Sequence, residues 1–173
     1  MQLYEQLLGA SFAALPRAMR DFHARPHAKA VASFDVERAP GWFAALIAGV
    51  FGLPRPARGV PVVLEVTAVG KTERWERRFG NKRFDSVQHA RDGRLVERAG
   101  LVAIEFELRA GETGLHFASQ RCSVARIPLP GWLAPAIEAT AIANGDGWSM
   151  EVCVSTPHFG WLERYGGVVV PAP

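Results

Sequence analysis

The chain has few cysteines and no apolar run long enough to cross a bilayer. Its two cysteines, Cys122 and Cys153, fall in segments that we predict to be strands. Two thiols are too few for the disulfide framework on which small secreted domains depend. The longest apolar run, residues 42–53, has about 12 residues, whereas a membrane-spanning helix needs roughly 20. The sequence therefore excludes a disulfide scaffold and a transmembrane helix.

Signals for export and for familiar chemistries are missing too. The opening, residues 1–5, has no basic region followed by an apolar stretch, so we expect a cytoplasmic protein. The sequence contains no HExxH, Cys-x-x-Cys, Gly-x-Ser-x-Gly or phosphate-binding loop. We therefore predict no metal site, no cofactor and no catalytic residue, and the interpretation favours a non-enzymatic protein over an enzyme.

Net charge is small, which argues against a nucleic-acid partner. Lys and Arg number 20 against 17 Asp and Glu, and the two signs interleave along the chain. The most basic stretch, residues 74–83, also carries Glu76 and follows Glu73, a pattern typical of an outward strand face. The remaining excess leaves an anionic ligand or a membrane surface open.

What the chain does have is enough apolar sequence for one domain. Hydrophobic residues make up 49% of its 173 residues and charged residues 21%, as in ordinary globular proteins. No linker, repeat or low-complexity stretch divides it. We therefore predict a single domain over residues 1–173.

Helical periodicity is confined to two regions. Apolar residues recur at spacings of three and four through residues 3–19, and Pro16 interrupts the pattern, which predicts helices over 2–9 and 15–23. Residues 42–51 are apolar nearly all round and are followed by Gly52, which is typical of a helix with a glycine C-cap.

Strand alternation dominates the rest of the sequence. It predicts strands over 30–37, 61–69, 72–79, 82–90, 94–98, 101–109, 114–127, 137–143, 147–156 and 161–170. The short connections between them, such as Gly80-Asn81, favour antiparallel neighbours.

The fold class that follows is α+β, mainly an antiparallel sheet with N-terminal helices. A sheet of this many strands seldom stays flat, so we expect it to be strongly curved or closed into a barrel. A lipocalin-like barrel fits best. The alternative is a helix-grip (START-like) fold, in which residues 42–51 would be the helix gripped by the sheet.

One strand face mixes aromatic and cationic side chains. Alternation places Trp75 and Arg77 on one face of their strand, and Phe84 with Ser86 on one face of the next. In the same way Phe117 and Arg121 share a face of the strand over 114–127. If these faces point inward, each buried guanidinium needs a carboxylate or a ligand anion.

Three interpretations of this face stay open. Arg77 and Arg121 either pair with carboxylates such as Glu97 and Glu105 and set the strand register, or bind an anion at the base of an apolar cavity. In the third interpretation the face lies on the outside of the sheet.

Three other features have structural explanations. His23 at the end of the helix over 15–23 is favoured as a cation by the helix dipole. Cys122 is expected to be an inert buried thiol. The proline-flanked segment 127–133 is expected to be a rigid loop whose Trp132 either fills the core or forms a lip over a cavity or a contact surface.

Several segments also resemble a known bacterial family. They are Leu3-Tyr4-Glu5-Gln6-Leu7-Leu8-Gly9, Leu15-Pro16, His23, Arg77-Arg78-Phe79-Gly80, Phe84, Ser86, the run 95–100 and the run 128–135. Together they are similar to the domain-of-unknown-function 4166 family over nearly the whole chain. The resemblance implies no established activity, cofactor or catalytic residue. It does imply that relatives occur alone or joined to oxidoreductase-like domains.

Two hypotheses about function follow. The first is a module that binds a small hydrophobic or amphipathic molecule, lipid-like in character, in a cavity enclosed by the curved sheet. Arg77, Arg121, Ser86 and Glu97 would surround its polar head, and Trp75, Phe84 and Phe117 would contact its apolar body. The second is an accessory domain for an oxidoreductase-like partner protein.

Overall fold

The computed structural model describes residues 2–172, which are mostly β-strand. The helices are α1 (Leu3–Leu8), the 3-10 helix η1 (Gly9–Ala14), α2 (Arg17–Ala24) and α3 (Trp42–Phe51). The strands are β1 (His27–Arg38), β2 (Ala57–Val69), β3 (Thr72–Phe79), β4 (Lys82–Arg91), β5 (Arg94–Ala99), β6 (Val102–Gly111), β7 (Gly114–Val124), β8 (Ile127–Pro128), β9 (Ala136–Asn144), β10 (Gly147–Thr156) and β11 (Gly160–Pro171).

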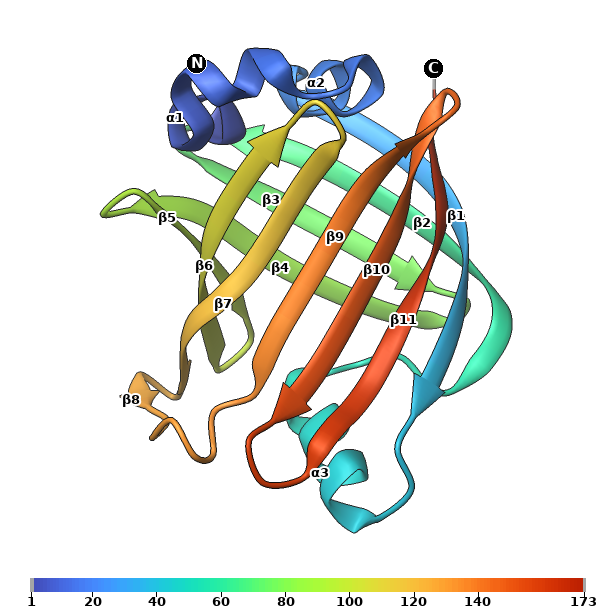
Figure 1. The fold of residues 1–173 in the computed structure, drawn as a ribbon, viewed down its shortest axis with the longest axis vertical. Coiled ribbons are helices and arrows are strands. Elements are labelled where there is room, and N and C mark those ends of the chain that lie inside the picture. The colour runs from blue at the N-terminus through green and yellow to red at the C-terminus, as the bar shows by residue number, and fades with distance from the viewer. Residues whose placement is uncertain (1, 173) are drawn as a thin grey trace.

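The strands close into an antiparallel barrel (Figure 1). Within residues 2–172 the order around the ring is β6-β5-β4-β3-β2-β1-β11-β10-β9-β7, and β7 pairs with β6 again. Only the short β8 stands outside this ring, paired with β7. The expectation of a curved antiparallel sheet or barrel is confirmed. Because barrel diameter grows with strand number and eight strands are just filled by side chains, a ring of this size has room inside.

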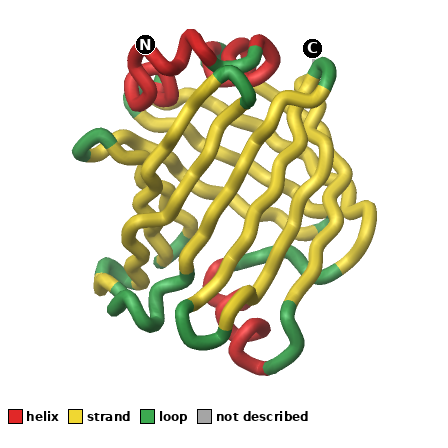
Figure 2. Tube along the Cα trace, in the orientation of Figure 1, coloured by secondary structure: helices red, strands yellow, loops and turns green. Residues whose placement is uncertain are grey.

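The helices close the two ends of the barrel, as Figure 2 shows by colour. The segment α1–η1–α2 covers one end, here called the α1 end, and α3 lies at the other, the α3 end (Figure 1). A helix over residues 42–51 is therefore present as predicted, but it caps an end instead of lying gripped in the sheet. Among residues 2–172, no helix combines the length and hydropathy that crossing a membrane requires.

The N-terminal helices are anchored by aromatic packing. Pro16 precedes α2 at its N-cap, which explains why the periodic segment splits there. Tyr4 on α1 and Phe22 on α2 are buried inside the barrel mouth. The Phe22 ring meets Trp148 edge-on with 5.3 Å between ring centroids, so the cap belongs to the same core as the barrel wall.

The strand predicted over residues 114–127 is too long and requires a correction. In the structure β7 ends at Val124, and Ala125 and Arg126 have positive φ angles of 50° and 69°. Two consecutive residues of this kind form the tight turn of a β-hairpin. The chain therefore folds back, and Ile127 pairs with Val124.

Candidate functional site

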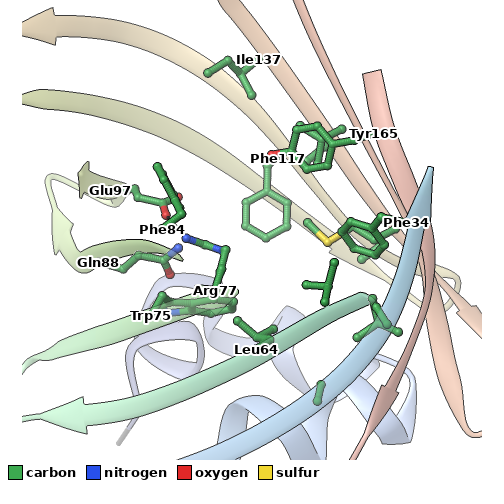
Figure 3. Close-up of a pocket in the computed structure, with 18 of the residues that line it drawn as sticks. Phe34, Leu64, Trp75, Arg77, Phe84, Gln88, Glu97, Phe117, Ile137 and Tyr165 are labelled. Carbon is green, nitrogen blue, oxygen red and sulfur yellow. Dashed lines mark hydrogen bonds and ion pairs between the residues drawn. The ribbon is translucent and has the colours of Figure 1, made fainter. Parts of the chain in front are cut away.

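A cavity of about 180 Å³ lies inside the barrel. Its wall is mostly apolar side chains from the strands. Tyr4 and His23 border it from the α1 end, and Phe51 and Leu53 from the α3 end. The polar side chains that reach it are few: Figure 3 shows Arg77, Gln88 and Glu97 together on one side, on strands β3 to β5, and Tyr165 of β11 on another. This is the composition expected of a small-molecule pocket: apolar walls with a few polar groups.

Arg77 is the centre of the polar cluster. Its Nη1 donates to Glu97 Oε1 at 2.8 Å and to Ser86 Oγ at 2.8 Å. Ser86 Oγ in turn donates to the same Glu97 oxygen at 2.5 Å. The register that pairs Arg77 with Phe84 and Trp75 with Ser86 across β3 and β4 brings these side chains together. Of the two carboxylates considered as partners, the structure selects Glu97.

Two aromatic rings hold the guanidinium in place. The Arg77 Cζ lies 4.9 Å from the centroid of the Trp75 ring and 5.6 Å from that of Phe84 (Figure 3). Both are cation–π distances, and partial burial strengthens such contacts. The cluster therefore offers a preformed and immobilised set of donors to the cavity.

Glu97 remains ionised in this environment. Burial alone raises the pKa of its carboxyl group, but the Arg77 charge and hydrogen bonds from Ser86, Arg77 and Gln88 outweigh burial and lower the pKa. The guanidinium and the carboxylate therefore balance each other, and the polar side of the cavity carries no net charge.

The network continues to the N-terminal cap through Gln88. Tyr4 Oη donates to Gln88 Oε1 at 2.9 Å, and the Gln88 amide bonds to Glu97. This orientation uses the amide as both acceptor and donor, so the hydrogen bonds run in series from α1 to β5. The pKa of Tyr4 is raised by burial and by the charges of Glu73 and Glu97, so its hydroxyl stays protonated and is a donor.

His23 is buried next to this network and is neutral. Its ring stacks on Tyr4 with 3.8 Å between centroids, and burial lowers its pKa to about 3. The prediction of a cation stabilised by the helix dipole is therefore wrong, because burial outweighs the dipole. Its Nδ1 is buried and has no hydrogen-bond partner within residues 2–172, which is unusual for a buried polar atom.

Glu73 is a buried carboxyl that the strand pattern did not predict to be part of the site. It accepts a hydrogen bond from Trp75 Nε1 at 3.1 Å and one from the backbone N–H of Leu3, which ties α1 to β3. Burial raises its pKa to about 7. Its spacing of two residues from Trp75 and four from Arg77 indicated a shared strand face, but a glutamate among the charges of residues 73–78 is typical of a solvent-facing position.

Arg121 does not reach the cavity, contrary to the alternation argument. Between β6 and β7 the register shifts so that Phe106 faces Ser119 while Glu105 faces Arg121. This β-bulge gives β7 one extra residue, which reverses the phase of alternation. Cys122 is buried in place of Arg121, and Arg121 is exposed on the outside.

The other predicted site residues are brought together. Trp75, Arg77, Phe84, Glu97 and Phe117 all line the cavity, and Ser86 is buried and bonded to two of them. Tyr4 and His23 were not selected because they are distant in the sequence and reach the cavity only through the helical cap.

Two further expectations meet different outcomes. Trp132 was considered a core residue, but its side chain is exposed in the loop between β8 and β9. Cys122 is buried, and burial raises its pKa to about 11, as expected for an inert thiol. No group of three or more metal-ligating side chains occurs among the residues that the structure describes.

Comparisons with known proteins identify the family. The model of the family described as "Domain of unknown function (DUF4166)" matches residues 15–169, so the chain belongs to that family. No curated protein matches the sequence. Among solved structures, "GphF Dehydratase 1" is similar at 9% identity over 98% of this chain and 83% of its own, with a TM-score of 0.21.

Proposed function

We propose that this member of the DUF4166 family binds a small, mostly apolar and uncharged molecule inside its barrel. The observation that carries the proposal is the charge-balanced Arg77–Glu97 cluster on the wall of a mostly apolar cavity. In this proposal the single domain is a container, used as lipocalin-like barrels are used.

The cavity volume limits the size of the guest. A protein cavity of about 150 Å³ accommodates benzene, and drug-sized ligands occupy roughly 300–1,000 Å³. At about 180 Å³ this cavity fits a guest of roughly six to ten non-hydrogen atoms. A single aromatic or compact aliphatic molecule meets this limit, and a phospholipid or long-chain fatty acid exceeds it.

The charge balance limits the polar part of the guest. An anion would compete with Glu97 for Arg77 and leave one buried negative charge in excess, which is unfavourable at low dielectric. A hydroxyl or carbonyl group adds no charge. Because both hydrogen bonds of Arg77 come from Nη1, Nη2 and Nε are the donors that would bond to the guest's oxygen.

His23 supports a second polar contact. Its unpartnered Nδ1 belongs to a side chain that borders the cavity at the α1 end. A neutral imidazole has one donor and one acceptor nitrogen, so it bonds equally well to a hydroxyl group or a carbonyl. We propose Trp75, Phe84 and Phe117 as the apolar contacts, and exclude Arg121 because it lies outside.

The test is a titration with matched neutral and anionic probes. We expect 4-ethylphenol and indole to bind to the wild-type protein in isothermal titration calorimetry, and benzoate, an anion of matching size, to bind at least about tenfold more weakly. In the Glu97→Gln variant Arg77 is unpaired, and the preference should reverse in favour of benzoate.

Two controls accompany the titration. Ala139→Phe fills the cavity from β9 and should abolish binding of every probe, whereas Arg121→Ala on the outer face should leave binding unchanged. A wild-type protein that prefers the benzoate, or one that binds none of the probes and carries no small molecule in native mass spectrometry, would refute the proposal.

A further inference from the structure

The two ends of the barrel differ in the side chains that they expose. Because neighbouring strands are antiparallel, five connections meet at the α3 end: residues 39–56, 80–81, 100–101, 125–135 and 157–159. The connections 25–26, 70–71, 92–93, 112–113 and 145–146 meet at the α1 end (Figure 1).

Among the described residues, exposed Trp and Phe side chains are confined to the α3 end. Within residues 2–172 the exposed Trp and Phe side chains are Trp42 at 74%, Trp132 at 61%, Phe159 at 57% and Trp161 at 45%. They lie in or directly beside three separate connections of that end. Exposed aliphatic side chains of the α3 end add to them: Leu46, Val50, Leu101 and Ile127. At the α1 end Val69 borders a connection, and among the described residues no exposed Trp or Phe does.

The outer face of α3 forms part of this apolar surface. Trp42, Leu46 and Val50 follow one another at intervals of four, so they share one face of the helix, and all three are exposed. Phe43 turns toward the barrel and stacks on Phe159 with 3.9 Å between ring centroids. This contact joins α3 to the β10–β11 connection, so the apolar surface is continuous across two elements.

Acidic residues distinguish the two ends. The five connections of the α3 end contain no Asp or Glu, and they carry Arg55 and Arg126. The connections of the α1 end also carry two cations, Arg25 and Lys71, but there Asp92, Glu112 and Asp146 accompany them. An end that combines exposed tryptophans with arginines and has no acidic residue in its connections is complementary to an anionic lipid surface, since tryptophan favours the bilayer interface and arginine the anionic headgroups.

We infer that the α3 end docks on the surface of an anionic lipid bilayer, with α3 lying in the interface and without spanning it. Trp42 and Trp132 come from separate connections and Trp161 from the start of β11, so the exposed tryptophans are spread over this end, which fits a flat lipid surface better than a single peptide. Phe51 and Leu53 border the cavity from this same end, so docking places the lipid surface next to the cavity. The inference itself does not depend on a cavity ligand.

The test is flotation of the purified protein with vesicles of two compositions. We expect the wild-type protein to float with vesicles of equal phosphatidylglycerol and phosphatidylcholine, and about tenfold less with phosphatidylcholine alone. The double variant Trp42→Ser, Trp132→Ser should lose this binding, and so should the double variant Arg55→Glu, Arg126→Glu. Val69→Ser, an equally exposed change at the α1 end, is the matched control and should float like wild type.

Several outcomes would overturn the inference. They are a wild-type protein that stays with neither kind of vesicle, equal binding to both compositions, and a tryptophan variant that floats like wild type. A dimer in sedimentation velocity that the tryptophan variant dissociates, without vesicle binding, would assign the same surface to a second copy of the chain instead. Circular dichroism melts of every variant establish that the barrel is folded.

Discussion

Replacing Arg77 by methionine should destabilise the protein by leaving Glu97 buried without its cation. The side chains of Arg77 and Glu97 are 19% and 17% exposed, so the pair is largely but not fully desolvated. Removing one partner of a buried ion pair costs about 3–5 kcal/mol. Because water still reaches both groups, we expect the lower end, about 3 kcal/mol.

Neutralising the partner should recover most of that loss. In the double variant Arg77→Met, Glu97→Gln no unpaired charge remains, and the amide still accepts the hydrogen bond from Ser86. We expect this variant to be within about 1 kcal/mol of wild type, since replacing a buried pair as a whole is often nearly neutral. Adding Glu97→Gln to Arg77→Met should therefore recover about 2 kcal/mol of stability.

The stability that Arg77→Met loses should depend on pH, because Glu97 titrates. In the wild-type protein the pKa of Glu97 is lowered, so its ionisation stabilises the fold above the unfolded-state pKa, and that stabilisation is lost as pH falls through the folded-state pKa. Without Arg77, burial dominates and raises the pKa. The penalty of Arg77→Met should then be present at pH 8 and should shrink as pH falls to 5.

Urea unfolding followed by tryptophan fluorescence measures these free energies, because Trp75 lies against the Arg77 guanidinium. With a slope of about 2 kcal/mol/M, the single variant should lower the midpoint by about 1.5 M. Arg121→Met, on the outer face of β7, is the control and should change the midpoint little. A single variant within about 0.5 kcal/mol of wild type, or a double variant no better than the single, would refute the reasoning.

Three further predictions concern other buried groups. Glu73→Gln should make the protein more stable than wild type at pH 8 by up to roughly 3 kcal/mol. Burial raises the Glu73 pKa to about 7, so ionisation of Glu73 between pH 4.5 and 7 destabilises the wild-type fold. Melting temperatures that run parallel for both proteins over pH 4–8 would contradict this. Tyr4→Phe should cost about 1–2 kcal/mol in urea unfolding, since it leaves the buried Gln88 oxygen without its donor, and unchanged stability would show that this hydrogen bond is immaterial. In native protein at pH 8, Ellman's reagent should modify Cys153 before Cys122, because burial raises the Cys122 pKa to about 11; equal rates would mean that the barrel wall opens at β7.

Local sequence pattern was sufficient where one principle acted alone. Pro16 divides the N-terminal periodicity, and Gly52 at φ 67° ends α3, because each residue has a backbone preference that holds in any context. Alternation likewise placed Trp75 with Arg77 on one strand face, but it left open whether that face points into the barrel, as it does in the structure. It also proposed Glu97 as the partner of Arg77, although Glu105 was an equal candidate. Glu105 in fact pairs with Arg91 on another face.

Alternation was wrong where the chain departs from a regular strand. The bulge before Arg121 reverses the faces of β7. Neither Gln120 nor its neighbours is a glycine or proline, so the sequence does not indicate a bulge there. The position of the extra residue is set by how β7 pairs with β6, and this pairing is a contact between strands. The same reasoning applies to the hairpin at Ala125 and Arg126, whose positive φ angles are unusual for these residue types.

Strand alternation and turn residues were enough to predict a curved antiparallel sheet or barrel with N-terminal helices, because both are local properties of the chain. Three features of the site depend instead on the folded barrel: Arg77 faces Glu97 and a cavity, Arg121 faces outward, and Tyr4 and His23 border the same cavity from α1 and α2. The physical reason is that strand register and helix docking are set by packing between residues far apart in the chain. Periodicity along a single segment does not specify such packing.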